Sequence, residues 1–333
     1  MEKLRRLLKI RGLSLLSKDN VVGVGMGYKH VGGVPTDKVS LVVLVKKKVP
    51  APDLNPKQII PKSVGTVRTD VIEVGEVRLL QRRSRMRPAP GGVSIGHYKV
   101  TAGTLGAIVA DKKTGQPLIL SNNHVLANMS EGNDDRASIG DPILQPGRYD
   151  GGTDDDIIGH LERFVGIYRS GEEAKCAVAQ GLERLANRII KTIRPKYSLK
   201  IYKTVDVPNL VDAALAKPVS AEVVEKSILE VGPVKGMTEA QVGMKVKKSG
   251  RTSGLSFGEI KVVGATMKVA MGDIGYAYFS DQIVTTAMAQ PGDSGSLLLD
   301  ENDRAVGLIS AGSEYASMAG TISNVLEMLE ATL

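Results

Sequence analysis

Apolar and polar residues alternate over much of the chain, which predicts a mainly β protein with few helices. In the N-terminal quarter, residues 39–45 and 69–75 alternate over lengths that are typical of half-buried strands. Leucines at helical spacing in residues 3–17 predict a short amphipathic helix, which Gly12 interrupts. Residues 1–81 are therefore expected to form a small α+β domain with a three-stranded core and a regulatory or assembly role.

Many short strands follow in residues 93–333, and the 37 glycines of the chain suit the turns between strands. The predicted strands are residues 101–110, 117–120, 141–146, 157–165, 246–260, 260–269, 276–279, 283–286, 296–299 and 305–310. Two segments have helical spacing instead: residues 171–194 carry one apolar stripe, and residues 322–329 close the chain. We expect the first of these helices to pack on the outside of the strands or at a partner interface.

Residues 82–92 stand between these two parts and combine arginine, proline and glycine. Such a composition is typical of exposed connections between domains. It predicts a plain linker, with a cleavable hinge near Arg87 as the alternative. The expected boundaries are then residues 1–81, the linker 82–92 and a second domain at 93–333.

Composition narrows the class of protein. One cysteine among 333 residues cannot form an internal disulfide, which is typical of a reducing compartment. No stretch resembles a signal peptide or approaches the ~18–20 apolar residues that span a bilayer, so we expect a soluble cytoplasmic protein without a membrane partner.

The net charge is +8, and basic runs such as residues 245–251 are expected to be solvated surface. No aromatic residues interleave with the basic ones, so we expect no nucleic-acid partner.

Two local patterns could indicate a cofactor, and neither is complete. Residues 21–29 contain glycines that resemble the start of a dinucleotide fingerprint, but its second half is missing and a strand fits better. The carboxylates in residues 150–156 could hold calcium, but their spacing does not match a helix–loop–helix calcium site. The sequence therefore predicts no cofactor and no metal.

The strongest chemical signal lies in residues 290–299, where Ser294 stands between two glycines, after an acid and before an apolar run. Glycine lets the backbone bend sharply and lets another molecule approach closely. A serine hydroxyl becomes a useful nucleophile only when a base takes its proton. His124 ends a strand-like apolar segment, and Asp212 lies between it and Ser294. These three residues are the candidate base, acid and nucleophile.

The sequence resembles the chymotrypsin-like serine peptidases, in particular the bacterial ones, from about residue 92 to residue 325. The motifs that carry the resemblance are Ser121-Asn122-Asn123-His124-Val125, Val211-Asp212-Ala213-Ala214-Leu215, the hairpin 246–260 and Gly292-Asp293-Ser294-Gly295. Their order of histidine, aspartate and serine is the order found in chymotrypsin. The resemblance implies two β-barrels, at about residues 93–220 and 240–320, and a serine endopeptidase that works through a catalytic triad.

The resemblance also implies a role for each residue of the site. Ser294 would attack the peptide carbonyl, His124 would take its proton, and Asp212 would orient the histidine. The backbone amides of Gly292 and Ser294 would form the oxyanion hole. Asp293 receives no catalytic role from the resemblance.

The resemblance places the pocket for the side chain at the cleaved position around Met288, with Ser310, Ala311 and Gly312 as its wall. Cleavage after lysine or arginine would need an acid at the floor, where Met288 stands. We therefore expect a preference for an apolar or small side chain.

Several alternatives remain open on the sequence alone. Asp206 or Asp156 could replace Asp212 as the acid. The protein could be a self-processing protease that cuts near Arg87, although a basic segment is a poor match to a pocket floored by Met288. It could also be a catalytically silent peptide-binding module on the same fold. The expected partner is a protein or peptide substrate in each case, and a homo-oligomer is left open.

Overall fold

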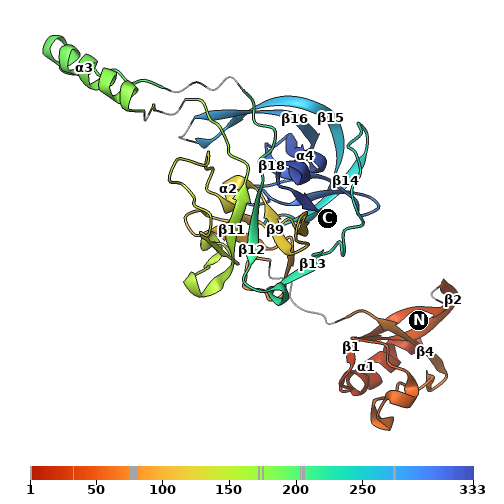
Figure 1. The fold of residues 1–333 in the computed structure, drawn as a ribbon. Helices are drawn as coiled ribbons and strands as arrows, with labels where there is room; N and C mark the ends of the chain where they lie inside the picture. Colours follow the sequence, from red (N-terminus) through yellow and green to blue (C-terminus); the bar gives the residue numbers. More distant parts are fainter. Residues whose placement is uncertain are drawn as a thin grey trace. The chain divides into compact units, whose positions relative to one another are not determined.

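The chain folds into two compact units, residues 1–80 and residues 81–333. The computed structural model describes residues 2–32, 34–75, 82–171, 173–174, 176–202, 204, 207–272 and 275–333 (Figure 1). The expected fold class is confirmed: a mainly β, two-barrel arrangement follows a small α+β domain.

The N-terminal unit is a four-stranded sheet with one helix, in the strand order β1-β2-β4-β3. Its elements are α1 (Glu2–Leu16), β1 (Val21–Val31), β2 (Val34–Val45), β3 (Ser63–Val64) and β4 (Val67–Glu73), with 3₁₀ turns at Ala51–Asp53 and Pro56–Gln58. Leu15 of the helix packs on Leu41 and Val43 of the central strand β2. Gly12 does not interrupt α1, and the short β3 adds a fourth strand to the expected three.

The first half of the second unit is an eight-stranded antiparallel sheet in the order β20-β8-β9-β12-β11-β10-β6-β7. Its strands are β6 (Ser94–His97), β7 (Gly103–Thr104), β8 (Ala107–Asp111), β9 (Pro117–Ser121), β10 (Pro142–Leu144), β11 (Ile157–Phe164), β12 (Ala214–Pro218) and β20 (Ala331–Thr332). Short helical turns lie at α2 (Asn123–Leu126), Arg148–Asp150, Asp154–Asp156 and Ala221–Val223. The sheet curls around one core that includes Ile95, Ile119, Ile143 and Ile158.

The second half is a closed barrel in the order β14-β15-β16-β19-β18-β17. Its strands are β14 (Lys245–Gly250), β15 (Gly254–Ala270), β16 (Tyr276–Thr286), β17 (Leu297–Asp300), β18 (Ala305–Gly312) and β19 (Ala316–Thr321). A third apolar core joins the two halves: Leu120 and Leu215 of the first sheet pack with Leu299 and Leu308 of the barrel. The C-terminal helix α4 (Ile322–Met328) completes this core, so it holds together the strands that lead to the candidate residues.

The structure differs from the sequence prediction at residues 82–92, which are packed on the second unit and are not a free linker. The strand β5 (Ala89–Gly91) is buried and pairs in parallel with β13 (Val224–Ile228). Arg82 donates to Ser249 Oγ at 2.8 Å and forms an ion pair with Glu230. A packed irregular segment and a linker can have the same composition, because partners distant in sequence decide which of the two forms.

The long helix of the second unit also starts later than predicted. The apolar stripe predicts residues 171–194, but α3 spans Ala177–Ile193 and begins after Cys176, whose sulfur accepts from the Ala179 amide at 3.4 Å. Before the helix, Glu173 forms an antiparallel bridge with Tyr202 instead.

Candidate active site

The segment that carries His124 is fastened to its surroundings by the polar residues that precede it. Ser121, the last residue of β9, donates its hydroxyl to Thr104 O at 2.7 Å. The Asn123 side-chain amide donates to Val165 O, also at 2.7 Å. The chain therefore leaves β9 on a fixed path into the short helix α2, where His124 stands half-buried.

Asp212 reaches this histidine because its two neighbours face the opposite way. Val211 and Ala213 are buried in the core between the two halves, so the side chain of Asp212 points away from that core toward His124. One carboxylate oxygen accepts from the His124 backbone amide at 3.2 Å, and the other is hydrogen-bonded to Nδ1 of the ring. Asn122 donates to the Asp212 carbonyl at 2.7 Å and fixes the backbone there.

The charge of Asp212 controls the protonation of His124. Burial of the imidazole lowers its pKa, but the carboxylate charge and the hydrogen bond of Asp212 raise it by more. The net result is that the pKa of His124 lies above its ordinary value of 6.5.

Ser294 stands at a sharp turn that requires glycine at the next position, Gly295. Gly295 has a φ of +93°, and a Cβ there would lie 2.1 Å from Ser121 Oγ. The Ser294 carbonyl accepts from the Thr104 amide at 2.8 Å, and Thr104 O in turn accepts from Ser121 at the end of β9. The Ser294 hydroxyl itself donates to Ser310 O at 3.2 Å. The structure thus joins His124 to Asp212 directly and connects the backbone of Ser294 to the segment of His124 through Thr104 of β7.

The turn also leaves two backbone donors free. Among the described residues, neither the Gly292 amide nor the Ser294 amide donates to a protein acceptor. Gly292 has a φ of +96°, and a Cβ there would lie 2.4 Å from the Arg251 guanidinium. Free, neighbouring amides on a turn are the usual means of binding a developing oxyanion.

Asp293 turns inward between these two donors and is fully buried. It pairs with Lys248 Nζ at 2.7 Å, and Lys248 is fully buried as well. It also accepts from the amides of Thr252 and Gln290 and from the hydroxyl of Ser253, at 2.6–2.9 Å. Burial raises the pKa of Asp293, but the hydrogen bonds of Lys248 and Ser253 outweigh it, so this pKa is lowered. Asp293 therefore shapes the turn and is not the acid beside His124.

No family model matches the chain. Streptogrisin-D of Streptomyces griseus is 41% identical over 83 residues, which are 25% of this chain and 20% of that protein. Serine protease 2 of Streptomyces fradiae is 39% identical over 88 residues, which are 26% of this chain and 48% of that protein. The matched segments span less than half of either relative. The chain resembles the bacterial chymotrypsin-like serine peptidases.

Solved structures of such peptidases are similar at low identity. The Nocardiopsis protease NAPase is 18% identical with a TM-score of 0.47, over 74% of this chain and 98% of that one. The Thermobifida fusca protease A is also 18% identical, with a TM-score of 0.46, over 73% and 97% of the two chains.

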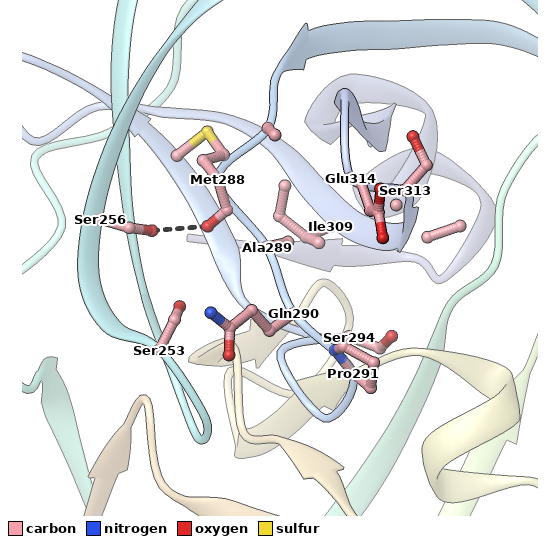
Figure 2. Close-up of a pocket in the computed structure, with 13 residues that line it drawn as sticks. Ser253, Ser256, Met288, Ala289, Gln290, Pro291, Ser294, Ile309, Ser313 and Glu314 are labelled. Carbon is pink, nitrogen blue, oxygen red and sulfur yellow. Dashed lines mark hydrogen bonds between the residues drawn. The ribbon is translucent and has the colours of Figure 1, made fainter.

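A cavity of about 750 Å³ opens beside Ser294 in this peptidase-like unit (Figure 2). Met288, Ala311 and Gly312 line it, as the resemblance implies. The lining also includes Ser253, Ser256, Ala287, Ala289, Gln290, Pro291, Ile309, Ser313 and Glu314. Met288 is nearly buried and belongs to the barrel core, and Ser256 donates to its carbonyl at 2.7 Å.

Ser310 lies at a second, neighbouring cavity of about 330 Å³, which His124 and Asp212 also line. The remaining lining of this second cavity is mostly apolar and includes Met129, Val269, Ala270, Met271, Phe279 and Met318. The histidine therefore faces an apolar surface, and Ser310 stands between the two cavities and not in the wall of the first.

Of the other two candidate acids, the structure describes Asp156, whose carboxylate is engaged away from His124. Asp156 accepts from the amide of Thr153 at 2.9 Å and from its hydroxyl at 3.0 Å, and so caps a 3₁₀ turn. Asp206 lies outside the described residues.

Two buried ion pairs around the site differ from the solvated surface that the sequence predicts. Lys248 and Arg251 belong to a run expected to be solvated, but Lys248 pairs with Asp293 and Arg251 with Asp150. Arg251 Nη2 lies 2.6 Å from Asp150 Oδ1 and joins the barrel to the first sheet. The alternation of residues along this strand indicates the burial of Lys248, because it places Lys248 on the same inward face as Val246.

Proposed function

We propose that this protein is a serine endopeptidase in which Ser294, His124 and Asp212 form the catalytic triad. The observation that carries the proposal is the His124–Asp212 pair beside a glycine-flanked serine turn with two free amides. One of the two relatives, serine protease 2 of Streptomyces fradiae, is a serine protease by name, which supports hydrolysis by a serine nucleophile.

In the proposed reaction, the Ser294 hydroxyl turns from Ser310 O toward His124 when substrate binds. Asp212 holds Nδ1 of the ring, so Nε2 is left to accept the proton as Oγ attacks the peptide carbonyl. The amides of Gly292 and Ser294 bind the oxyanion of the tetrahedral intermediate. His124 then gives the proton to the leaving amine, and water hydrolyses the resulting ester by the same steps in reverse order.

The raised pKa of His124 predicts the acid limb of the pH–rate profile. Protonated imidazole cannot accept the serine proton, so kcat/KM should fall as the pH drops through a midpoint above 6.5. Asp212→Asn removes the negative charge and should move this midpoint down. Asp141→Asn is a matched control, because Asp141 is paired with His97 instead. Equal midpoints for the native chain and Asp212→Asn would contradict the assignment.

The proposed specificity is for an apolar or small side chain at the cleaved position. Met288, Ala289, Ile309 and Ala311 supply apolar lining to the cavity beside Ser294. An acid stands at Glu314, but it is solvent-exposed, so water screens its charge.

A peptide library tests the endopeptidase activity and the specificity together. We expect mass spectrometry to find cuts inside the peptides, after apolar or small residues, at least tenfold more often than after Lys or Arg. A Ser294→Ala preparation gives the background. Preferred cutting after Lys or Arg that Glu314→Gln removes would overturn the specificity, and trimming from the ends alone would overturn the endopeptidase activity.

Self-processing near Arg87 has less support. A peptidase needs an extended, accessible segment, whereas Arg87 is half-buried and donates to Met86 O at 2.8 Å and to Asp156 O at 3.1 Å. A silent binding module would not need the His124–Asp212 pair.

A further inference from the structure

The helix α3 carries a long apolar stripe that the described residues of the second unit leave uncovered. The stripe consists of Val178, Leu182, Leu185, Ile189 and Ile193. Their spacings of three and four residues place them on one face of the helix. Between 55 and 72% of the surface of each is exposed to solvent. Apolar rows of this length are rarely left exposed to water, so the stripe indicates that a partner outside the described residues covers it.

The opposite face of α3 is basic. Arg184, Arg188 and Lys191 point away from the stripe at the helical angle, and all three are exposed. Residues 177–202 hold six basic side chains and one acidic one, Glu183. An apolar stripe opposed by a basic face is the pattern of a helix that lies in the surface of an anionic bilayer.

The segment that returns from α3 keeps the helix formed without covering the stripe. Asn187 donates to Leu199 O at 2.9 Å and accepts from the Leu199 amide at 2.7 Å. Ala179 is the buried residue of α3, and it lies on the side of this return. The helix therefore needs little ordering before it binds a surface.

The residues that flank α3 and its return on either side, Tyr168, Ser170 and Asn209, are hydrogen-bonded within the peptidase-like unit. The Asn209 side chain accepts from the Tyr168 amide at 2.8 Å and donates to Tyr168 O at 2.9 Å. The Ser170 amide donates to Tyr276 O at 2.8 Å. A surface that holds α3 would hold the attached unit too.

We propose that α3 lies in the surface of an anionic lipid bilayer, with its stripe among the acyl chains and its basic residues at the phosphates. A lysine or arginine that lies next to such a surface is attracted by the negative charge of the lipids. A second copy of the chain would cover the stripe but would leave the basic face without a partner of opposite charge. Nucleic acid would use the basic face but leave the stripe in water. No helix among the described residues is long and apolar enough to cross a bilayer, and lying in its surface does not require crossing.

Sedimentation with vesicles tests the proposal on the full chain. We expect binding to vesicles of equal parts phosphatidylglycerol and phosphatidylcholine, and at least tenfold weaker binding to phosphatidylcholine alone. Leu185→Glu should weaken the first binding at least tenfold. Val242→Glu is the matched control, because Val242 is an equally exposed apolar residue outside α3. No binding to the anionic vesicles, or equal binding of Leu185→Glu and the native chain, would overturn the proposal.

Two further measurements distinguish a lipid bilayer from a second copy of the chain as the partner that covers the stripe. The chain has no tryptophan, so Leu182→Trp provides a single reporter whose emission should shift to the blue with anionic vesicles. Gln180→Trp, on the polar side of the helix, should not shift. If the native chain is instead a dimer without lipid and Leu185→Glu makes it a monomer, a second copy covers the stripe and the proposal is wrong.

Discussion

Ser294→Ala is expected to lower kcat by about a million-fold, to the level left by substrate binding and the oxyanion hole alone. His124→Ala should do nearly the same, because the members of a triad act as one unit and their losses do not add. Reaction with a fluorophosphonate probe tests whether the nucleophile and its base are assembled, since the probe attaches only to an activated serine. The native chain should be labelled, and both variants should not.

The matched control is Ser313→Ala, which removes an exposed hydroxyl from the same cavity and should leave labelling intact. Labelling that survives Ser294→Ala would place the nucleophile elsewhere and contradict the triad. If the full chain is unlabelled, a chain that begins at residue 81 separates a blocked site from an absent one. Residue 81 is the suitable start, because residues 82–92 belong to the second unit and a later start would remove β5.

The second large effect is expected from Lys248→Met, which should lower the free energy of unfolding by about 3–5 kcal/mol. Lys248 and Asp293 are both fully buried, and their charged groups are 2.7 Å apart. Removal of the lysine leaves the carboxylate in a low-dielectric site with too few partners for its charge. The turn around Ser294 should relax with it, so probe labelling should slow as well. Urea unfolding measures the stability.

Lys245→Met is the control for this prediction. Lys245 stands on the same strand and is paired with Glu259, but its side chain is exposed. Exposed pairs contribute little to stability, so this variant should unfold close to the native midpoint. Equal losses for the two variants would show that the buried pair is not what stabilises the turn.

The sequence predicts the fold well where local pattern decides the structure. Alternation locates most strands around Ser294 and His124, because half-buried strands repeat every two residues. Asp212 is indicated by the resemblance instead, through the motif Val211-Asp212-Ala213-Ala214-Leu215, and it lies just before the strand β12.

The sequence does not reveal contacts that depend on distant partners. Residues 82–92 have the composition of a linker, and partners far along the chain, such as β13 and Glu230, make them part of the second unit. Lys248 belongs to a basic run, and its burial depends on Asp293, which the run itself does not contain. Helical spacing predicts α3 but not its start, because the extended pairing of Glu173 with Tyr202 replaces the first turns.

The place of Ser294 in the chain sets when its turn can form during synthesis. His124 and Asp212 are synthesised before Ser294, and Asp293, whose carboxylate pairs with Lys248, is synthesised after that lysine. A chain that stops before residue 293 therefore has the proposed base but not the turn that carries the proposed nucleophile. The proposed site is thus complete only after most of the second unit has been synthesised.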